Sequence, residues 1–164
     1  MCKETILNEQ DFLRIFDEVL SLITDTNLEV REWAKKVDDL LKDVVYGSLI
    51  KNNPFDLDAL LELICKKLNN THNNEVLMVL IKWIEILHSI TNVDILKCVP
   101  RFLERLLTII DQKHKVSQTK HEVSKKALEQ LTQFLDEFKQ SGTRTMELDK
   151  EIMEKLLGYL LKRQ

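Results

Sequence analysis

The sequence predicts an all-α fold, an α-solenoid of three helical hairpins followed by a terminal helix. The 164 residues include only three Gly and two Pro, so few positions favour tight turns and long helices are expected. Apolar residues recur every three or four positions, which is the spacing of one helix face. This pattern itself returns after about 46 residues, a period typical of stacked helical hairpins.

The first hairpin is expected over residues 11–48. Asp11 precedes its first helix, residues 24–27 supply turn-forming side chains, and Gly47 and Ser48 are a plausible end for the second helix. The apolar stripe of the first helix contains Phe12, Ile15, Phe16, Val19, Leu20 and Ile23; that of the second contains Val30, Ala34, Val37, Leu41 and Val45, with Trp33, Leu40 and Val44 expected to widen it.

The period places two further hairpins at residues 55–90 and 98–140. Glu29-Val30, in the second helix of the first hairpin, aligns with Glu75-Val76 and then with Glu122-Val123 in the second helices of the later hairpins. Residues 145–163 look like the first half of a fourth copy, with Ile152, Leu156, Leu157, Leu160 and Leu161 on one side. Residues 94–98 are expected to form a short helical turn. The whole chain, 1–164, is therefore predicted to be a single repeat domain.

The middle hairpin contains an unusually apolar helix. Residues 74–90 read NEVLMVLIKWIEILHSI, and between residues 76 and 87 only Lys82 and Glu85 are charged. A helix that is apolar on nearly every side must be covered on most sides. This run is too short to cross a bilayer, which needs about 20 apolar residues. We therefore expect it to be the core of the stack, with Trp83 buried.

Composition argues against several classes of function. The formal net charge is −3, so no overall positive field would attract nucleic acid. Cys2, Cys65 and Cys98 form no CxxC pair, which favours free thiols in a reducing compartment, with Cys65 and Cys98 buried. The first residues contain no apolar run typical of a signal peptide, and a cytoplasmic location is predicted.

No catalytic or metal-binding motif is recognisable. The sequence has no Gly-rich phosphate loop and no GxSxG, HExxH or CxxC motif. His114 and His121 lie seven positions apart without a nearby Cys, which is a poor spacing for zinc. His88, near a helix end, is expected to be half-buried or to suit the helix dipole rather than to act as a base, and Asp38-Asp39 is expected to be solvated. We therefore expect no enzyme, no cofactor and no metal.

The first hairpin resembles the HEAT repeat. Leu22-Ile23-Thr24-Asp25 followed by Glu29-Val30-Arg31-Glu32-Trp33-Ala34 matches that family's acidic residue near the end of the first helix and its Val-Arg-x-x-Ala in the second. The next copies depart from this pattern, with Leu77 and Ser124 in the position of Arg31.

Three strings resemble the amino-terminal region of the Vac-fourteen family: VDDLLKDVV (37–45), IKWIEILHSI (81–90) and DILKCVPRFLERLLTII (94–110). The resemblance covers roughly residues 11–140 of a family whose members are several times longer. It implies a HEAT-repeat scaffold in the complex that makes phosphatidylinositol 3,5-bisphosphate on endosome and vacuole membranes. The implied partners are a phosphatidylinositol 3-phosphate 5-kinase and a lipid 5-phosphatase, and membrane contact would be peripheral. The alternative is a HEAT or armadillo adaptor that binds peptide segments in transport or phosphatase assembly.

Candidate partner-binding residues follow from the period. Shifts of about 46 residues place polar side chains of the second helices in rows. These side chains are either simply solvated or receive a partner segment, and Trp33 is either core or an exposed anchor. A basic segment either is a solvated loop or contacts an acidic partner or anionic membrane. Self-association is left open. The rows are Lys36, Lys82 and Glu129, and Asp39, Glu85 and Thr132; the basic segment contains Lys113, Lys115 and Lys120, followed by Lys125 and Lys126.

Overall fold

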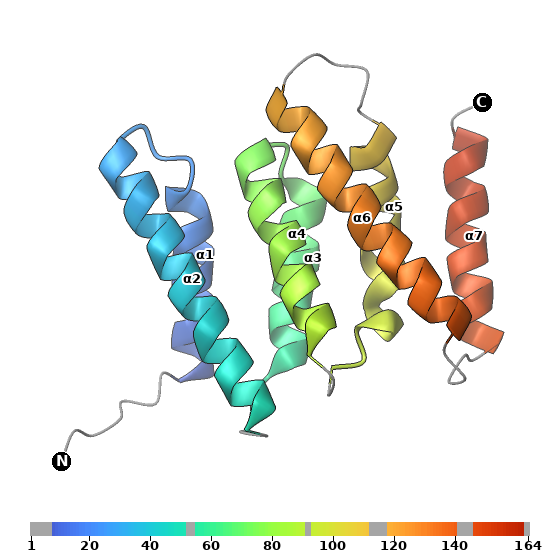
Figure 1. Ribbon diagram of the computed structural model, residues 1–164, viewed down its shortest axis with the longest axis horizontal. Coiled ribbons are helices and arrows are strands. Elements are labelled where there is room, and N and C mark those ends of the chain that lie inside the picture. Colours follow the sequence, from blue (N-terminus) through green and yellow to red (C-terminus); the bar gives the residue numbers. More distant parts are fainter. Residues whose placement is uncertain (1–7, 52–54, 91–92, 112–117, 141–145, 163–164) are drawn as a thin grey trace. The chain divides into compact units, whose positions relative to one another are not determined.

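The computed structural model describes residues 8–51, 55–90, 93–111, 118–140 and 146–162. Within these ranges the chain forms seven α-helices and one short 3-10 helix, and no strand (Figure 1). The predicted fold class, an all-α solenoid of helical hairpins with a terminal helix, is confirmed. The elements are α1 (Glu9–Leu22), α2 (Leu28–Ile50), α3 (Leu57–Asn70), α4 (Asn74–Ser89), η1 (Ile95–Cys98), α5 (Val99–Asp111), α6 (Gln118–Gln140) and α7 (Met146–Lys162).

Asparagine side chains begin three of the helices. Asn8, Asn27 and Asn73 precede α1, α2 and α4, and each side-chain oxygen accepts a hydrogen bond from a backbone N–H of the first turn. Asn73 accepts two, from the N–H groups of Glu75 (2.9 Å) and Val76 (3.2 Å). These bonds satisfy donors that the helix itself leaves unpaired, and so they fix where each helix starts.

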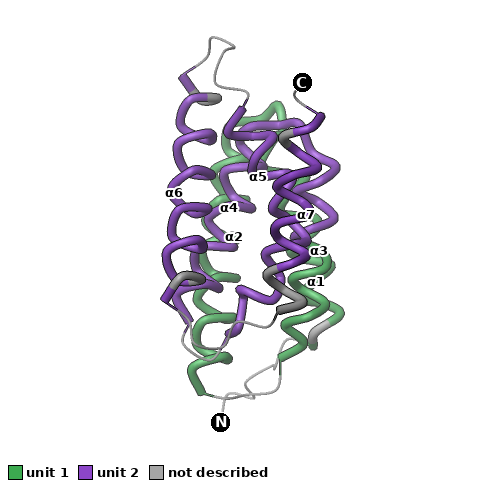
Figure 2. Tube along the Cα trace, turned by 90° about the vertical axis from the view of Figure 1, so that its right-hand side faces the viewer, with its two compact units in different colours: residues 1–63 green, residues 64–164 purple. Residues whose placement is uncertain are grey.

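The chain divides into two compact units, residues 1–63 and 64–164, with the boundary inside α3 (Figure 2). The single-domain organisation therefore stays a prediction. In the first unit α1 packs against α2. Phe12 and Phe16 of α1 are buried, and the Phe12 ring meets the Phe55 ring edge to face at 5.3 Å. Burial of large aromatic side chains is a main source of stability in so small a core.

The apolar stripe of α2 is narrower than predicted. Ala34, Leu41 and Val45 are buried as expected, but Trp33, Leu40 and Val44 are 66%, 63% and 46% exposed. Each of these exposed residues immediately precedes one of the three buried residues. Because successive residues of a helix are rotated by about 100°, this second stripe runs beside the core stripe without entering the core. The helix also continues to Ile50, past the end expected at Gly47 and Ser48.

The prediction that Asp38 and Asp39 are both solvated is wrong for Asp38. Asp39 is exposed, whereas Asp38 is only 2% exposed and forms an ion pair with Lys42. Lys42 also lies 3.3 Å from Asp39. A lysine one turn further along the helix compensates the buried carboxylate, which would otherwise be costly.

The second unit contains the end of α3 and all later helices. Here α4 packs against α6, and α5 packs against α6, α7 and η1. Helix α4 is covered on most sides, as its sequence predicted: Trp83 and Ile84 are fully buried, whereas Lys82 is exposed. The other buried residues of this helix are Val76, Leu77, Leu80, Ile81 and Leu87.

The terminal helix α7 docks on α5 along only part of its apolar side. Ile152 is buried, and the Tyr159 hydroxyl donates a hydrogen bond to the Leu107 carbonyl at 3.0 Å. Leu157 and Leu161, which the sequence places on one side with Ile152, are 54% and 69% exposed. The expected helical turn before α5 is confirmed as η1. Cys65 is buried as predicted, whereas Cys98, which was also expected to be buried, is only half-buried.

Candidate partner-binding surface

A strip of charged and polar side chains follows the contact between α4 and α6. It contains Lys82, Glu85 and His88 from α4, together with side chains from α6. These α4 residues occupy the narrow side of the helix that the core leaves uncovered, because each follows the previous one by three positions. We call this set the α4–α6 strip: Lys82, Glu85 and His88 with Lys126, Glu129, Gln130 and Glu137.

An ion pair crosses the strip at its centre. Lys126 Nζ lies 2.8 Å from Glu85 Oε1, and both side chains are partly exposed. Beside it, Lys82 is exposed and has no ion-pair partner among the described residues. Glu129 is also exposed and lies 3.9 Å from Lys125 on its own helix. The strip therefore offers an incoming segment one free cation at Lys82 and a carboxylate at Glu129 that is only loosely held.

His88 joins both sides of the strip near the end of α4. Its Nε2 contacts the Glu137 carboxylate, and Gln130 Nε2 lies 3.0 Å from its Nδ1. The imidazole ring also lies over Phe134, with ring centroids 4.6 Å apart. The half-buried position predicted for His88 is confirmed. With both ring nitrogens engaged in contacts to α6, this histidine fixes how the two helices fit together.

The rows stay a prediction, but the α6 side chain that pairs with Glu85 is not its repeat equivalent. The period places Thr132 beside Glu85, whereas the residue that pairs with Glu85 is Lys126. Thr132 instead donates a hydrogen bond to the Leu128 carbonyl of its own helix. Neighbouring helices pack ridge into groove at an angle, so the residue that faces a given position is displaced from its repeat equivalent by more than one turn.

Lys36 and Asp39 lie on α2 in the first unit, and both are exposed. Lys36 Nζ lies 5.3 Å from the ring centroid of Trp33, which is within range of a cation–π interaction. Trp33 is thus the exposed alternative of the two that the sequence left open. The partner-binding role of these residues stays a prediction.

The basic segment also stays a prediction. Lys113, Lys115 and His114 lie outside the described residues, as does the side chain of Lys120. His121 is exposed on the first turn of α6. In the described part of the chain, no three His, Cys, Asp or Glu side chains are grouped closely enough to hold a metal ion. Over the same ranges, no helix combines the length and apolarity that a bilayer span requires.

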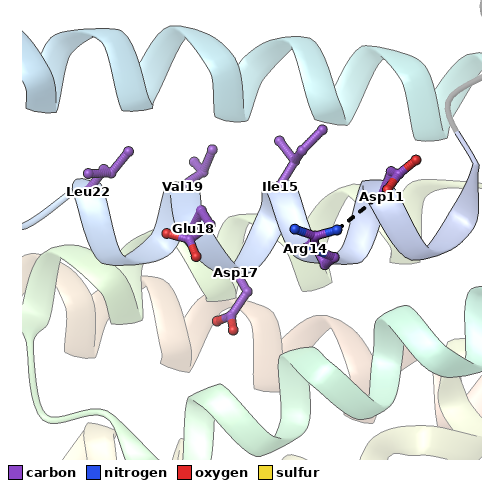
Figure 3. A pocket seen from close by; sticks show the side chains of 7 residues that line it. All are labelled: Asp11, Arg14, Ile15, Asp17, Glu18, Val19 and Leu22. Atoms are coloured by element: carbon purple, nitrogen blue, oxygen red, sulfur yellow. Dashed lines mark ion pairs between the residues drawn. The ribbon is translucent and has the colours of Figure 1, made fainter.

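A shallow pocket of about 630 Å³ runs along α1 (Figure 3). All of its lining residues come from this one helix, and Figure 3 shows Ile15, Val19 and Leu22 pointing to one side and Asp17 to the other. Arg14 lies 3.9 Å from Asp11, and both are exposed. Because a single helix cannot bring groups together from several directions, this pocket lacks the convergent arrangement of a catalytic site.

Several residues of the strip could not be identified from the sequence. Glu137 carried no signal, and Lys126 stood out only as part of the basic segment, because the role of each depends on which turn of α6 faces α4. The one weak signal was the position of Ser124 and Gln130 at the apolar spacing of α6, where polar residues are unusual. Both are buried, and Ser124 donates a hydrogen bond to the Ile109 carbonyl at 2.8 Å.

An all-α solenoid of helical hairpins defines the class of protein, and such folds typically present extended surfaces to other molecules. Comparison with known proteins adds a particular relative. The chain is 31% identical over 130 residues to the Protein VAC14 homolog of Arabidopsis thaliana, and the match covers 79% of this chain. The chain resembles a VAC14 region, which confirms the resemblance inferred from its helical strings.

The matched region is a small part of that relative. The chain spans about 16% of the length of the curated protein that it matches. No protein-family model matches the chain. No solved structure matches it either.

Proposed function

We propose that this chain is a non-catalytic scaffold that binds and positions protein partners. The observation that carries the proposal is the likeness to a VAC14 region over most of the chain. An all-α stack with a partly exposed strip of mixed charge supports it, because such stacks bind partners along rows of side chains. By the same likeness, the complex served is the one that makes phosphatidylinositol 3,5-bisphosphate.

The proposed mechanism is geometric. A rigid stack that holds two partners at a fixed separation raises their effective concentration, so each binds better in the presence of the other. The partners implied are a phosphatidylinositol 3-phosphate 5-kinase and a lipid 5-phosphatase. The chain would then be cytoplasmic and would reach endosome or vacuole membranes peripherally, through its complex.

The α4–α6 strip is the proposed contact for the kinase. Lys82 offers an exposed ammonium group beside the Glu85–Lys126 ion pair, while the apolar side of α4 is occupied by the core. A partner segment with the opposite alternation of charge would find complementary groups there. Such complementarity contributes more to specificity and association rate than to affinity.

The test is binding of the purified kinase to the 164-residue chain and to two charge variants. Lys82→Glu reverses the free cation without touching the core. Glu85→Lys combined with Lys126→Glu keeps the ion pair but inverts its polarity, so the fold is preserved while the surface pattern changes. We expect each variant to weaken kinase binding about tenfold, mostly through slower association at low salt.

The matched control is Asp11→Arg combined with Arg14→Asp, which inverts an exposed pair on α1 and should leave binding unchanged. Unaltered kinase affinity in both strip variants would remove the strip from the proposal. A chain that fails to bind the kinase and instead captures extended peptides would favour the adaptor alternative and overturn the scaffold assignment.

A further inference from the structure

A second polar site lies away from the α4–α6 strip, where the end of α3 meets α5 and α7. This pocket has a volume of about 430 Å³, and none of its lining residues belongs to α4 or α6. Its walls are mainly polar. The side chains that the argument uses are Asn69, Arg101, Glu104, Arg105, Thr108 and Lys155.

Arg105 is fixed in this pocket by the main chain. Its Nε donates a hydrogen bond to the Leu68 carbonyl at 3.0 Å, and its Nη2 donates to the Thr71 carbonyl at 2.6 Å. These two bonds hold the plane of the guanidinium group, which has five N–H donors in all. The remaining donors are therefore presented in a set orientation, without the entropy loss that a mobile side chain would suffer on binding.

The lining of the pocket contains three cationic side chains and only one carboxylate. Arg101, Arg105 and Lys155 form no ion pair with any described carboxylate. Glu104 is the one acidic side chain of the lining, and its Oε1 is engaged by Lys162 Nζ at 2.6 Å. Partial burial lowers the pKa of Arg105, as expected for a cation that loses water without gaining an anion.

We propose that this pocket binds a phosphate monoester. Three cations from two helices surround a volume larger than a bare ion, so a phosphate group and part of the molecule that carries it can enter together. A tetrahedral dianion can accept hydrogen bonds from the fork of Arg105 on one side and from Arg101 and Lys155 on others. The Asn69 amide adds donors at the rim, while the Thr108 hydroxyl is occupied by the Glu104 carbonyl at 2.8 Å.

The phosphate monoester could come from a soluble metabolite or from a lipid headgroup, and two experiments separate these sources. In the first, inorganic phosphate and glycerol 3-phosphate are titrated into the 15N-labelled chain at constant ionic strength. We expect saturable shifts of the Arg101, Thr108 and Lys155 amide signals, with chloride producing none. In the second, the chain is mixed with vesicles that contain phosphatidic acid or an equal charge of phosphatidylserine.

Arg101→Ala and Lys155→Ala test the site, because both side chains reach solvent and neither is part of the core. Each is expected to weaken binding about fivefold, as loss of one partly exposed charge contact would. Lys150→Ala is the matched control for Lys155→Ala on α7. Lys150 is exposed and its Nζ lies 3.8 Å from Glu154 Oε1, and it does not line the pocket. Identical melting curves for the three variants would show that the fold is intact.

Saturable shifts that weaken in the two pocket variants support a site for a soluble monoester. Binding confined to phosphatidic acid vesicles, and weakened in the same variants, supports the same chemistry with a lipid source. The proposal is overturned by shifts that do not saturate, by equal responses to chloride and phosphate with no preference for phosphatidic acid, or by binding that survives in both pocket variants.

Discussion

The Lys126 ammonium group lies 2.8 Å from a Glu85 carboxylate oxygen and so links α6 to α4 across two hairpins. The pair is only partly shielded from water, with side-chain exposures of 27% and 38%. A double-mutant cycle with Glu85→Ala and Lys126→Ala, read by urea unfolding, should therefore give a coupling energy of about 0.5–1 kcal/mol. Raising the salt concentration should reduce it. Coupling that is absent at low salt would mean that the two groups do not pair in solution.

The two tryptophans should respond very differently to truncation. Trp83 is fully buried, so Trp83→Ala should cost about 3–5 kcal/mol in the free energy of unfolding. Trp33 is 66% exposed, so Trp33→Ala should change it by no more than about 0.5 kcal/mol. Each variant retains one tryptophan, and circular dichroism gives a common probe. A change of only a degree or two in the melting temperature for Trp83→Ala would mean that this side chain faces solvent.

The cap of α4 gives a test of local rather than global packing. The Asn73 side chain accepts hydrogen bonds from two backbone N–H groups and is itself exposed. Asn73→Ala should therefore cost about 1 kcal/mol, whereas Asn73→Asp should cost little, because a carboxylate also accepts these bonds and suits the positive end of the helix. Equal stability of the Ala and Asp variants would contradict the capping role.

Arg105 should contribute to stability as well as to the proposed phosphate site. Arg105→Met removes two donors and leaves the Leu68 and Thr71 carbonyls without these partners, which should cost about 1–3 kcal/mol. Arg105→Lys keeps the charge but cannot hold both carbonyls in one plane, so an intermediate loss is expected. Hydrogen exchange at the end of α3 should accelerate in both variants. Unchanged hydrogen exchange there would show that the Arg105 hydrogen bonds to the Leu68 and Thr71 carbonyls do not form.

The sequence was sufficient to predict the helices and the burial of most side chains of α4. In α4 the apolar residues leave one charged side at Lys82 and Glu85, and no other arrangement could bury so many apolar groups. In α2 two apolar stripes run side by side, that of Ala34 and that of Trp33. Period alone cannot say which stripe faces the partner helix, because both have helical spacing, and the choice depends on how α1 lies against α2.

The candidate site was predictable only within one helix. Exposure of Lys82 follows from its own sequence neighbours, since every nearby position is apolar. The partners of Glu85 and His88 come from α6 and depend on the angle at which two helices cross, which repeat spacing does not contain. Arg105 illustrates the same limit, since its bonds go to the backbone carbonyls of Leu68 in α3 and of Thr71 just after it, and these leave no trace in side-chain pattern.

The contact between Glu104 and Lys162 should make the docking of α7 sensitive to acid. The hydrogen bond from Lys162, and then its charge, hold the pKa of Glu104 below its usual value of 4.5, and Lys155 adds a smaller effect. A depressed pKa in the folded state means that the stabilisation is complete above the unfolded pKa and is lost as pH falls through the folded one. Because both side chains are mostly exposed, the effect should be well under about 1 kcal/mol. Carboxyl NMR should give a Glu104 pKa that rises toward 4.5 in Lys162→Met, and an unchanged pKa would show that the pair is absent.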